Sequence, residues 1–147
     1  MSSDEIARFL AEPRTAALST LDHSGAPHAA GMWFAIGGPE ILMWTYAKSQ
    51  KAVNLRRDPR CALLVEDGVA YGELRGVMVT GAVTLIETIE DIRSIGIALY
   101  ERYTKPATGV AVEDGPIVEI ERQARKRVGI SLPLAHAASW DHRKLGM

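Results

Sequence analysis

The chain has 147 residues, a net charge of −1 and a single cysteine, and 47% of its residues are hydrophobic. This length suits one domain spanning residues 1–147, and the small net charge gives no electrostatic reason to expect binding to nucleic acid or to a membrane surface. The acidic N-terminus is unlike a secretion signal, and no apolar run approaches membrane-spanning length, so we expect a cytoplasmic protein.

The first half of the chain predicts a short helix followed by antiparallel strands. Ser2 and Glu5 form a capping-box pattern in front of a helix that Pro13 ends. Strands are expected at 15–21, 27–36 and 41–46, joined by turns as a three-stranded meander. A second short helix should begin after Ser49 and end at Asp58, and the apolar run 61–65 predicts a fourth strand.

The second half predicts one long strand, a helix and a final strand. Residues 71–87 are apolar and contain three glycines, which we expect to bend a single long strand as in a barrel wall. Thr88 should cap a helix that extends to about Tyr103, followed by a loop at 104–115. Residues 116–123 fit either a helix or a strand, and 127–135 a last strand. The pattern indicates a mainly β protein, an antiparallel β-barrel with peripheral helices.

The start of the helix after Ser49 is the strongest candidate for a binding site. A helix start with free N–H groups and a Ser cap suits an anion. Lys48 and Lys51 lie where the helix dipole disfavours cations, which suggests that a bound anion such as phosphate compensates them. The residues alone leave open a solvated surface helix whose basic side chains only keep the protein soluble.

Aromatic side chains are concentrated on two neighbouring predicted strands. Met32, Trp33 and Phe34 lie on one strand, and Trp44 and Tyr46 on the next. An apolar, partly aromatic groove beside a phosphate site is what a planar cofactor with a phosphate tail requires. Core packing is the alternative, and we expect alternate aromatics to divide between core and groove. The serine, cysteine and histidine contexts indicate neither a catalytic nucleophile nor a metal site.

Four segments together resemble the pyridoxamine-5′-phosphate-oxidase-like split-barrel flavoproteins: PHAAGMWFAI, ILMWTYAKSQKAVNLRRDPRCALLVED, RGVMVTGAVTLIE and SWDHRKL. The likeness is strongest to the actinobacterial branch described as dependent on the deazaflavin coenzyme F420. The resemblance implies a split β-barrel homodimer with two cofactors in grooves at the subunit interface. It implies a cofactor phosphate at Ser49, Lys51 and Asn54, with Arg56 or Arg57 near the tail. The residues it places along the ring system are Met32, Trp33, Thr45 and Tyr46.

Two departures from the resemblance bear on the substrate and the cofactor. Gly76 stands where the true oxidases usually carry Gln, and their C-terminal substrate-phosphate motif is missing. Both departures argue against pyridoxamine phosphate as substrate and favour F420 over FMN. The resemblance therefore implies an oxidoreductase that transfers a hydride between F420 and an unsaturated small organic substrate. An FMN-dependent oxidoreductase of the same fold and a non-catalytic carrier of F420 or flavin are the alternatives, and no catalytic residue is identified.

Overall fold

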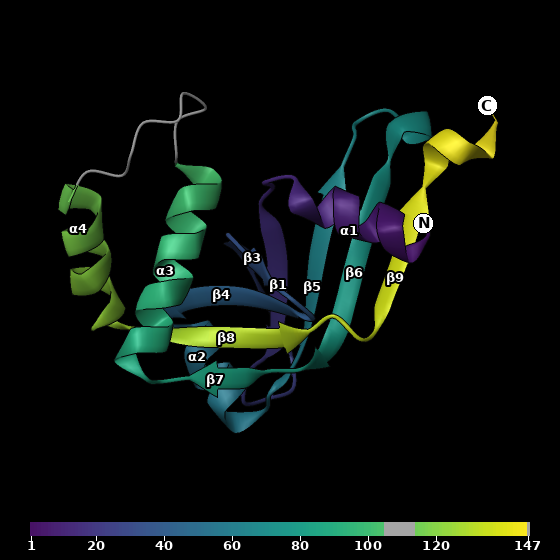
Figure 1. Cartoon of the computed structure of the whole chain (residues 1–147). Coiled ribbons are helices and arrows are strands. Elements are labelled where there is room, and N and C mark those ends of the chain that lie inside the picture. Colours follow the sequence, from purple (N-terminus) through teal and green to yellow (C-terminus); the bar gives the residue numbers. More distant parts are fainter. Residues whose placement is uncertain (105–113, 147) are drawn as a thin grey trace.

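The computed structural model describes residues 1–104 and 114–146 and arranges them as two antiparallel sheets with helices at their edges (Figure 1). One sheet has the strand order β2-β1-β5-β6-β9, and the other has the order β3-β4-β8-β7. The expected mainly β, antiparallel architecture with peripheral helices is confirmed. The strands are β1 Ala16–Leu21, β2 Pro27–Met32, β3 Ala35–Gly37, β4 Glu40–Tyr46, β5 Arg60–Asp67, β6 Arg75–Ala82, β7 Thr84–Ile86, β8 Arg127–Pro133 and β9 Ala137–Asp141.

The helices begin close to where local sequence signals predict them. They are α1 Ser3–Ala11, α2 Gln50–Arg57, α3 Ile89–Tyr103 and α4 Asp114–Ala124, with short 3₁₀ turns η1 Tyr71–Glu73 and η2 His142–Leu145. The capping box of α1 is present, because Ser2 Oγ accepts a 3.2 Å hydrogen bond from the Glu5 N–H. Helix α4 resolves the helix-or-strand alternative for 116–123 in favour of a helix. The loop expected at 104–115 lies for the most part outside the described residues.

The chain crosses from one sheet to the other at Trp33 and Phe34, where a single strand over 27–36 was expected. That expectation and the three-stranded meander were wrong, because β2 pairs with β1 whereas β3 pairs with β4 in the second sheet. Phe34 is fully buried at the crossing and belongs to the core. In one continuous strand, successive side chains would point alternately to the two faces of the sheet. Burying the Phe34 ring between the sheets interrupts this alternation.

Side chains from both sheets fill the space between them. Leu18, Leu63 and Val77 come from the first sheet, and Ile41 and Ile130 from the second; all five are fully buried in one cluster. Helix α1 runs across β5 and β6 in Figure 1, and it adds Phe9 and Leu10 to the same cluster. Because the interior is packed, the candidate sites among the described residues lie on the outer surfaces.

The stretch 71–87 differs from the single bent strand that was expected. It forms η1, β6 and β7, and the break falls at Val83, whose N–H donates to the Pro59 carbonyl at 2.9 Å. The C-terminal tail supplies a further strand, β9, which pairs with β6. Cys61 packs half-buried against the core, and burial raises the pKa of its thiol to about 11. No helix within the described residues is both long and apolar enough to span a bilayer.

Candidate functional site

The junction between β4 and α2 has the geometry of a helix start open to an anion. Ser49 caps α2, since its Oγ accepts from the Ala52 N–H at 3.3 Å and lies 3.2 Å from Thr45 Oγ1. Thr45 is buried at the end of β4, so it fixes the position of the Ser49 hydroxyl. The predicted cap is confirmed, and it places Thr45 and Ser49 side by side.

Unpaired donors surround this helix start. Within the described residues, the backbone N–H groups of Gln50 and Lys51 have no hydrogen-bond acceptor, as the first N–H groups of a helix commonly lack one. No carboxylate of the described residues lies within ion-pair distance of Lys48 or Lys51. Free N–H groups, the positive end of the helix dipole and two unpaired ammonium groups together suit a phosphate.

Asn54, Arg56 and Arg57 of α2 form hydrogen bonds that hold the helix against its neighbours. Asn54 is fully buried, donates to Thr20 Oγ1 at 3.1 Å and accepts from Arg57 at 3.2 Å. Arg57 also donates to the Leu21 carbonyl at 2.6 Å, and Arg56 donates to the Ala47 carbonyl at 2.7 Å. Of the three predicted phosphate residues, Ser49 and Lys51 therefore lie at the start of the helix, whereas Asn54 is buried against β1. The Arg56 side chain reaches back to the carbonyl just before that start, and the Arg57 side chain reaches the end of β1.

The predicted ring-binding residues divide between core and surface. Met32 is buried in the core, whereas the next residue, Trp33, is 48% exposed. The Trp33 indole stacks on Tyr103 with ring centres 4.5 Å apart and planes 5° apart. The Tyr103 hydroxyl donates to the Arg14 carbonyl at 2.7 Å and lies 3.2 Å from the Phe34 N–H. Tyr103 thus attaches α3 to the sheet crossing and presents one face of Trp33 to the surface.

Tyr46, the other aromatic among the predicted ring-binding residues, is 50% exposed and contacts a residue that the sequence did not indicate. The Arg127 guanidinium lies 4.2 Å from the Tyr46 ring centre and 4.6 Å from that of Trp44. Burial lowers the pKa of Arg127, and its buried Nε has no hydrogen-bond acceptor among the described residues. Arg127 faces Tyr46 across the β4–β8 pair, a register that strand patterns alone do not give.

An apolar cavity of about 180 Å³ adjoins Trp33 and Trp44, with α3 and α4 forming its other walls. Leu99 of α3 and Ile120 of α4 contribute apolar side chains, and Gln123 of α4 adds an amide. The volume of this cavity is below the range of roughly 300–1,000 Å³ common for small-molecule sites, so it would hold only part of an organic molecule. It brings the exposed indole of Trp33 next to a space that an organic substrate could enter.

The tail residue Trp140 covers Gly76. The two residues face each other across the β6–β9 pair, and a Cβ atom at position 76 would collide with the Trp140 ring. A side chain of any size at position 76 would therefore require Trp140 to move. This contact explains how a Gly and the SWDHRKL tail occur together in one chain.

The outer face of the five-stranded sheet is uncharged over a wide area. The β pairing sets two rows of outward residues side by side, namely Gly31, Ala17, Leu64, Met78 and Ala138 in one row and Ala29, Ser19, Ala62 and Thr80 in the other. Most are small or apolar, and Met78 is 37% exposed. An uncharged, partly apolar face of this kind is a candidate for a protein–protein contact.

Comparisons with known proteins give one family. Comparison with curated proteins gave no match. The crystal structure of the conserved hypothetical protein Rv2991 from Mycobacterium tuberculosis is 44% identical, with a TM-score of 0.90 over 100% of this chain and 89% of that one. An F420 reductase (23% identity, TM-score 0.67, 89% of this chain and 94% of that one) has the same fold. So does a FAD- and heme-binding protein from Mycobacterium smegmatis (15% identity, TM-score 0.71, 94% of this chain and 70% of that one).

The sequence profile of pyridoxamine 5′-phosphate oxidase matches residues 2–140, so this chain belongs to that family and its two sheets form the family's split barrel.

Proposed function

We propose that the protein is a homodimeric reductase that uses the deazaflavin coenzyme F420 to reduce an unsaturated small organic substrate. The observation that carries this proposal is the start of α2, where the free N–H groups and the Ser49 cap lie next to Lys48 and Lys51 in the chain. These groups fit the phosphate of a cofactor tail. The resemblance favours F420 over FMN, because this chain has Gly76, covered by Trp140, where the true oxidases usually carry Gln.

The chain's own residues would bind and orient the cofactor. Ser49 and Lys51 would hold the phosphate, and Asn54 would keep α2 in the position that this requires. Arg56 and Arg57 are exposed although each already has protein partners, and they would contact the anionic tail from that exposed side. Thr45 would support the Ser49 hydroxyl, as it does in the structure.

The aromatic residues would form the part of the site from which water is excluded. The exposed face of Trp33 and the ring of Tyr46 offer planar apolar surfaces, and buried Met32 backs the strand that carries Trp33. The bound cofactor would supply the hydride, while the protein supplies orientation and excludes water. The cavity beside Trp33 and Trp44 would accept an apolar part of the substrate.

The uncharged outer face of the five-stranded sheet supports the dimer. A second copy of the chain would cover a surface on which Ala17, Leu64 and Met78 stand in one row. Covering such a face removes apolar area from water without burying charge. The family resemblance implies two cofactor sites at the subunit interface of this dimer.

The experiment is a fluorescence titration of purified, cofactor-free protein with F420 and, separately, with FMN. We expect micromolar or tighter binding of F420, much weaker binding of FMN, and at least about tenfold weaker F420 binding by Lys51→Ala, which corresponds to about 1.4 kcal/mol. Arg8→Ala, which removes one positive charge from the exposed side of α1, is the matched control and should bind normally.

Each other outcome has a defined meaning. Preference for FMN would assign the protein to the flavin-dependent alternative. Tight F420 binding without oxidation of the reduced cofactor by enones, quinones or tetrapyrroles would favour a carrier without turnover. Unchanged affinity of Lys51→Ala for both cofactors would refute the phosphate assignment.

A further inference from the structure

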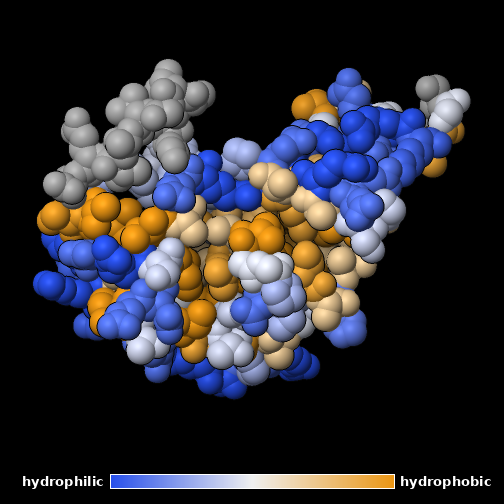
Figure 2. Space-filling view, in the orientation of Figure 1, coloured by the Kyte–Doolittle hydropathy of each residue, from blue (hydrophilic) through white to orange (hydrophobic). Residues whose placement is uncertain are grey.

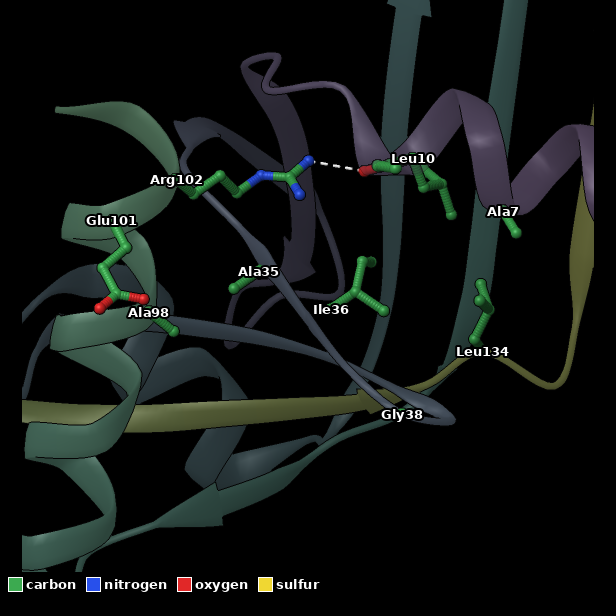
Figure 3. Close-up of a pocket in the computed structure, with 10 residues that line it drawn as sticks. Ala7, Leu10, Ala35, Ile36, Gly38, Ala98, Glu101, Arg102 and Leu134 are labelled. Atoms are coloured by element: carbon green, nitrogen blue, oxygen red, sulfur yellow. Dashed lines mark hydrogen bonds between the residues drawn. The ribbon is translucent and has the colours of Figure 1, made fainter. Parts of the chain in front are cut away.

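A second cavity, of about 610 Å³, opens between α1, β3 and α3. Figure 2 shows apolar side chains gathered at the centre of this face, and Figure 3 shows how the cavity is lined. Ala7 and Leu10 of α1, Ile36 of β3 and Ala98 of α3 form apolar walls. Its volume lies within the range of roughly 300–1,000 Å³ that is common for small-molecule sites. Alanine on two of the walls leaves space that larger side chains would fill.

Arg102 of α3 brings a positive charge to this apolar space. Its Nη2 donates to the Leu10 carbonyl at 2.6 Å and to the Glu12 carbonyl at 2.9 Å, and its guanidinium carbon lies 4.6 Å from the Phe34 ring centre. Figure 3 shows the other terminal nitrogen directed into the cavity. Among the described residues, neither this Nη1 nor the buried Nε has a hydrogen-bond acceptor. The guanidinium is therefore held in place with donors left over.

The second charged residue of the lining does not neutralise Arg102. Figure 3 shows the Glu101 carboxylate beside Ala98, directed away from the guanidinium. A neutral apolar occupant would exclude water from Nη1 without replacing its hydrogen bonds, which is unfavourable. A cation would be repelled. A ligand with an anionic group on an apolar body would pair with the positive charge of Arg102 and also contact the apolar walls.

We propose that this cavity binds a hydrophobic monocarboxylic acid, with the carboxylate on Arg102 and the apolar chain against α1 and β3. The carboxylate would accept from Nη1, and the chain would contact Leu10 and Ile36. The cavity shares no residue with the start of α2 or with the exposed aromatics Trp33 and Tyr46. The proposal therefore does not depend on the identity of the cofactor.

The test uses the full chain without cofactor and octanoate as the probe. Isothermal titration calorimetry should give a dissociation constant on the order of 0.5 mM or tighter for this small ligand, and octan-1-ol should bind at least tenfold more weakly. In methyl NMR spectra, octanoate should shift the signals of Ala7, Ile36 and Ala98. Equal affinity for the acid and the alcohol, or methyl shifts confined to other parts of the protein, would overturn the proposal.

Two variants test separately the charge of Arg102 and the space inside the cavity. Arg102→Gln should weaken octanoate binding at least tenfold and leave octan-1-ol binding unchanged. Because Arg102 also supports α1, Ala7→Phe provides an independent variant that fills the cavity from an exposed position, and it should abolish binding. Ala26→Phe, in an exposed turn, is the matched control and should bind octanoate normally. Normal octanoate binding by Ala7→Phe would overturn the proposal. Loss of the dimer in Ala7→Phe, measured by light scattering, would also overturn it, because a second copy of the chain would then be the occupant of the cavity.

Discussion

The buried side-chain amide of Asn54 donates a 3.1 Å hydrogen bond to Thr20 Oγ1, which joins α2 to β1. Its Oδ1 accepts from Gln50 at 2.8 Å and from Arg57 at 3.2 Å. Asn54→Ala would leave the Thr20 hydroxyl buried without this partner and remove all three bonds. We expect the free energy of unfolding to fall by about 2–3 kcal/mol, measured by urea denaturation.

Gln50→Ala is the control for this change, because Gln50 is exposed and its side chain contributes one of the three bonds. It should cost less than about 1 kcal/mol. If Asn54→Ala kept normal stability but lost cofactor affinity, Asn54 would be a cofactor ligand and not a residue that seats the helix.

The Tyr103 hydroxyl and the Tyr103 ring have separable roles. Tyr103→Phe keeps the stack on Trp33 but removes the hydrogen bonds to the Arg14 carbonyl and the Phe34 N–H, so we expect a loss of about 1 kcal/mol with little change in Trp33 fluorescence. Tyr103→Leu also removes the stack and should shift the tryptophan emission to longer wavelength. Identical emission spectra for the two variants would show that the stack does not fix the environment of Trp33.

Gly96 allows α3 to pack closely on β4 and α4. A Cβ atom there would lie 2.5 Å from Trp44 Cζ3 and 2.8 Å from Ile120 Cγ2. Gly96→Ala should therefore destabilise the protein by about 1–3 kcal/mol through overpacking, although alanine is the better helix former by about 1 kcal/mol. Thermal unfolding would measure the change. Gly72→Ala, where a Cβ meets no atom within 4 Å, should leave the melting temperature nearly unchanged.

The ion pair between Glu5 and Lys144 should make the contact between α1 and the tail sensitive to acid. The hydrogen bond from Lys144 lowers the pKa of Glu5 from 4.5 to about 2. A depressed carboxyl pKa stabilises the folded state above the ordinary value, and this contribution is lost as pH falls toward 2. An NMR titration that follows the Glu5 side-chain carboxyl carbon should give a midpoint near pH 2, and Lys144→Ala should move this midpoint up toward 4.5. A midpoint near pH 4.5 in the unmodified protein would contradict the pairing.

Features set by a few neighbouring residues were predictable from sequence. The capping box of α1, the Ser49 cap and the buried stripe of Ile92, Ile95 and Leu99 on α3 all follow local rules, and the structure has each of them. The family resemblance also gave the split barrel. The cofactor, the substrate and the roles of the site residues remain predictions.

Features that depend on distant partners could not be read from local patterns. The sheet crossing at Trp33 and Phe34 requires a core contributed by both sheets, and the tail becomes β9 only because β6 lies beside it. Arg127 and Tyr103 looked like ordinary strand and helix residues. Their importance arises from aromatic neighbours far away in sequence, Tyr46 and Trp33, which only the folded chain brings close.

The chain passes from one sheet to the other at Trp33 and Phe34, and this passage couples the unfolding of the two sheets. Because Phe34 is buried between the sheets and its N–H lies near the Tyr103 hydroxyl, neither sheet can open without disturbing α3 and the other sheet. Amide hydrogen exchange under native conditions should therefore give the same opening free energy for Leu18 in β1 and Ile41 in β4. The barrel would behave as one cooperative unit, and a ligand that binds against Trp33 would slow exchange in both sheets equally.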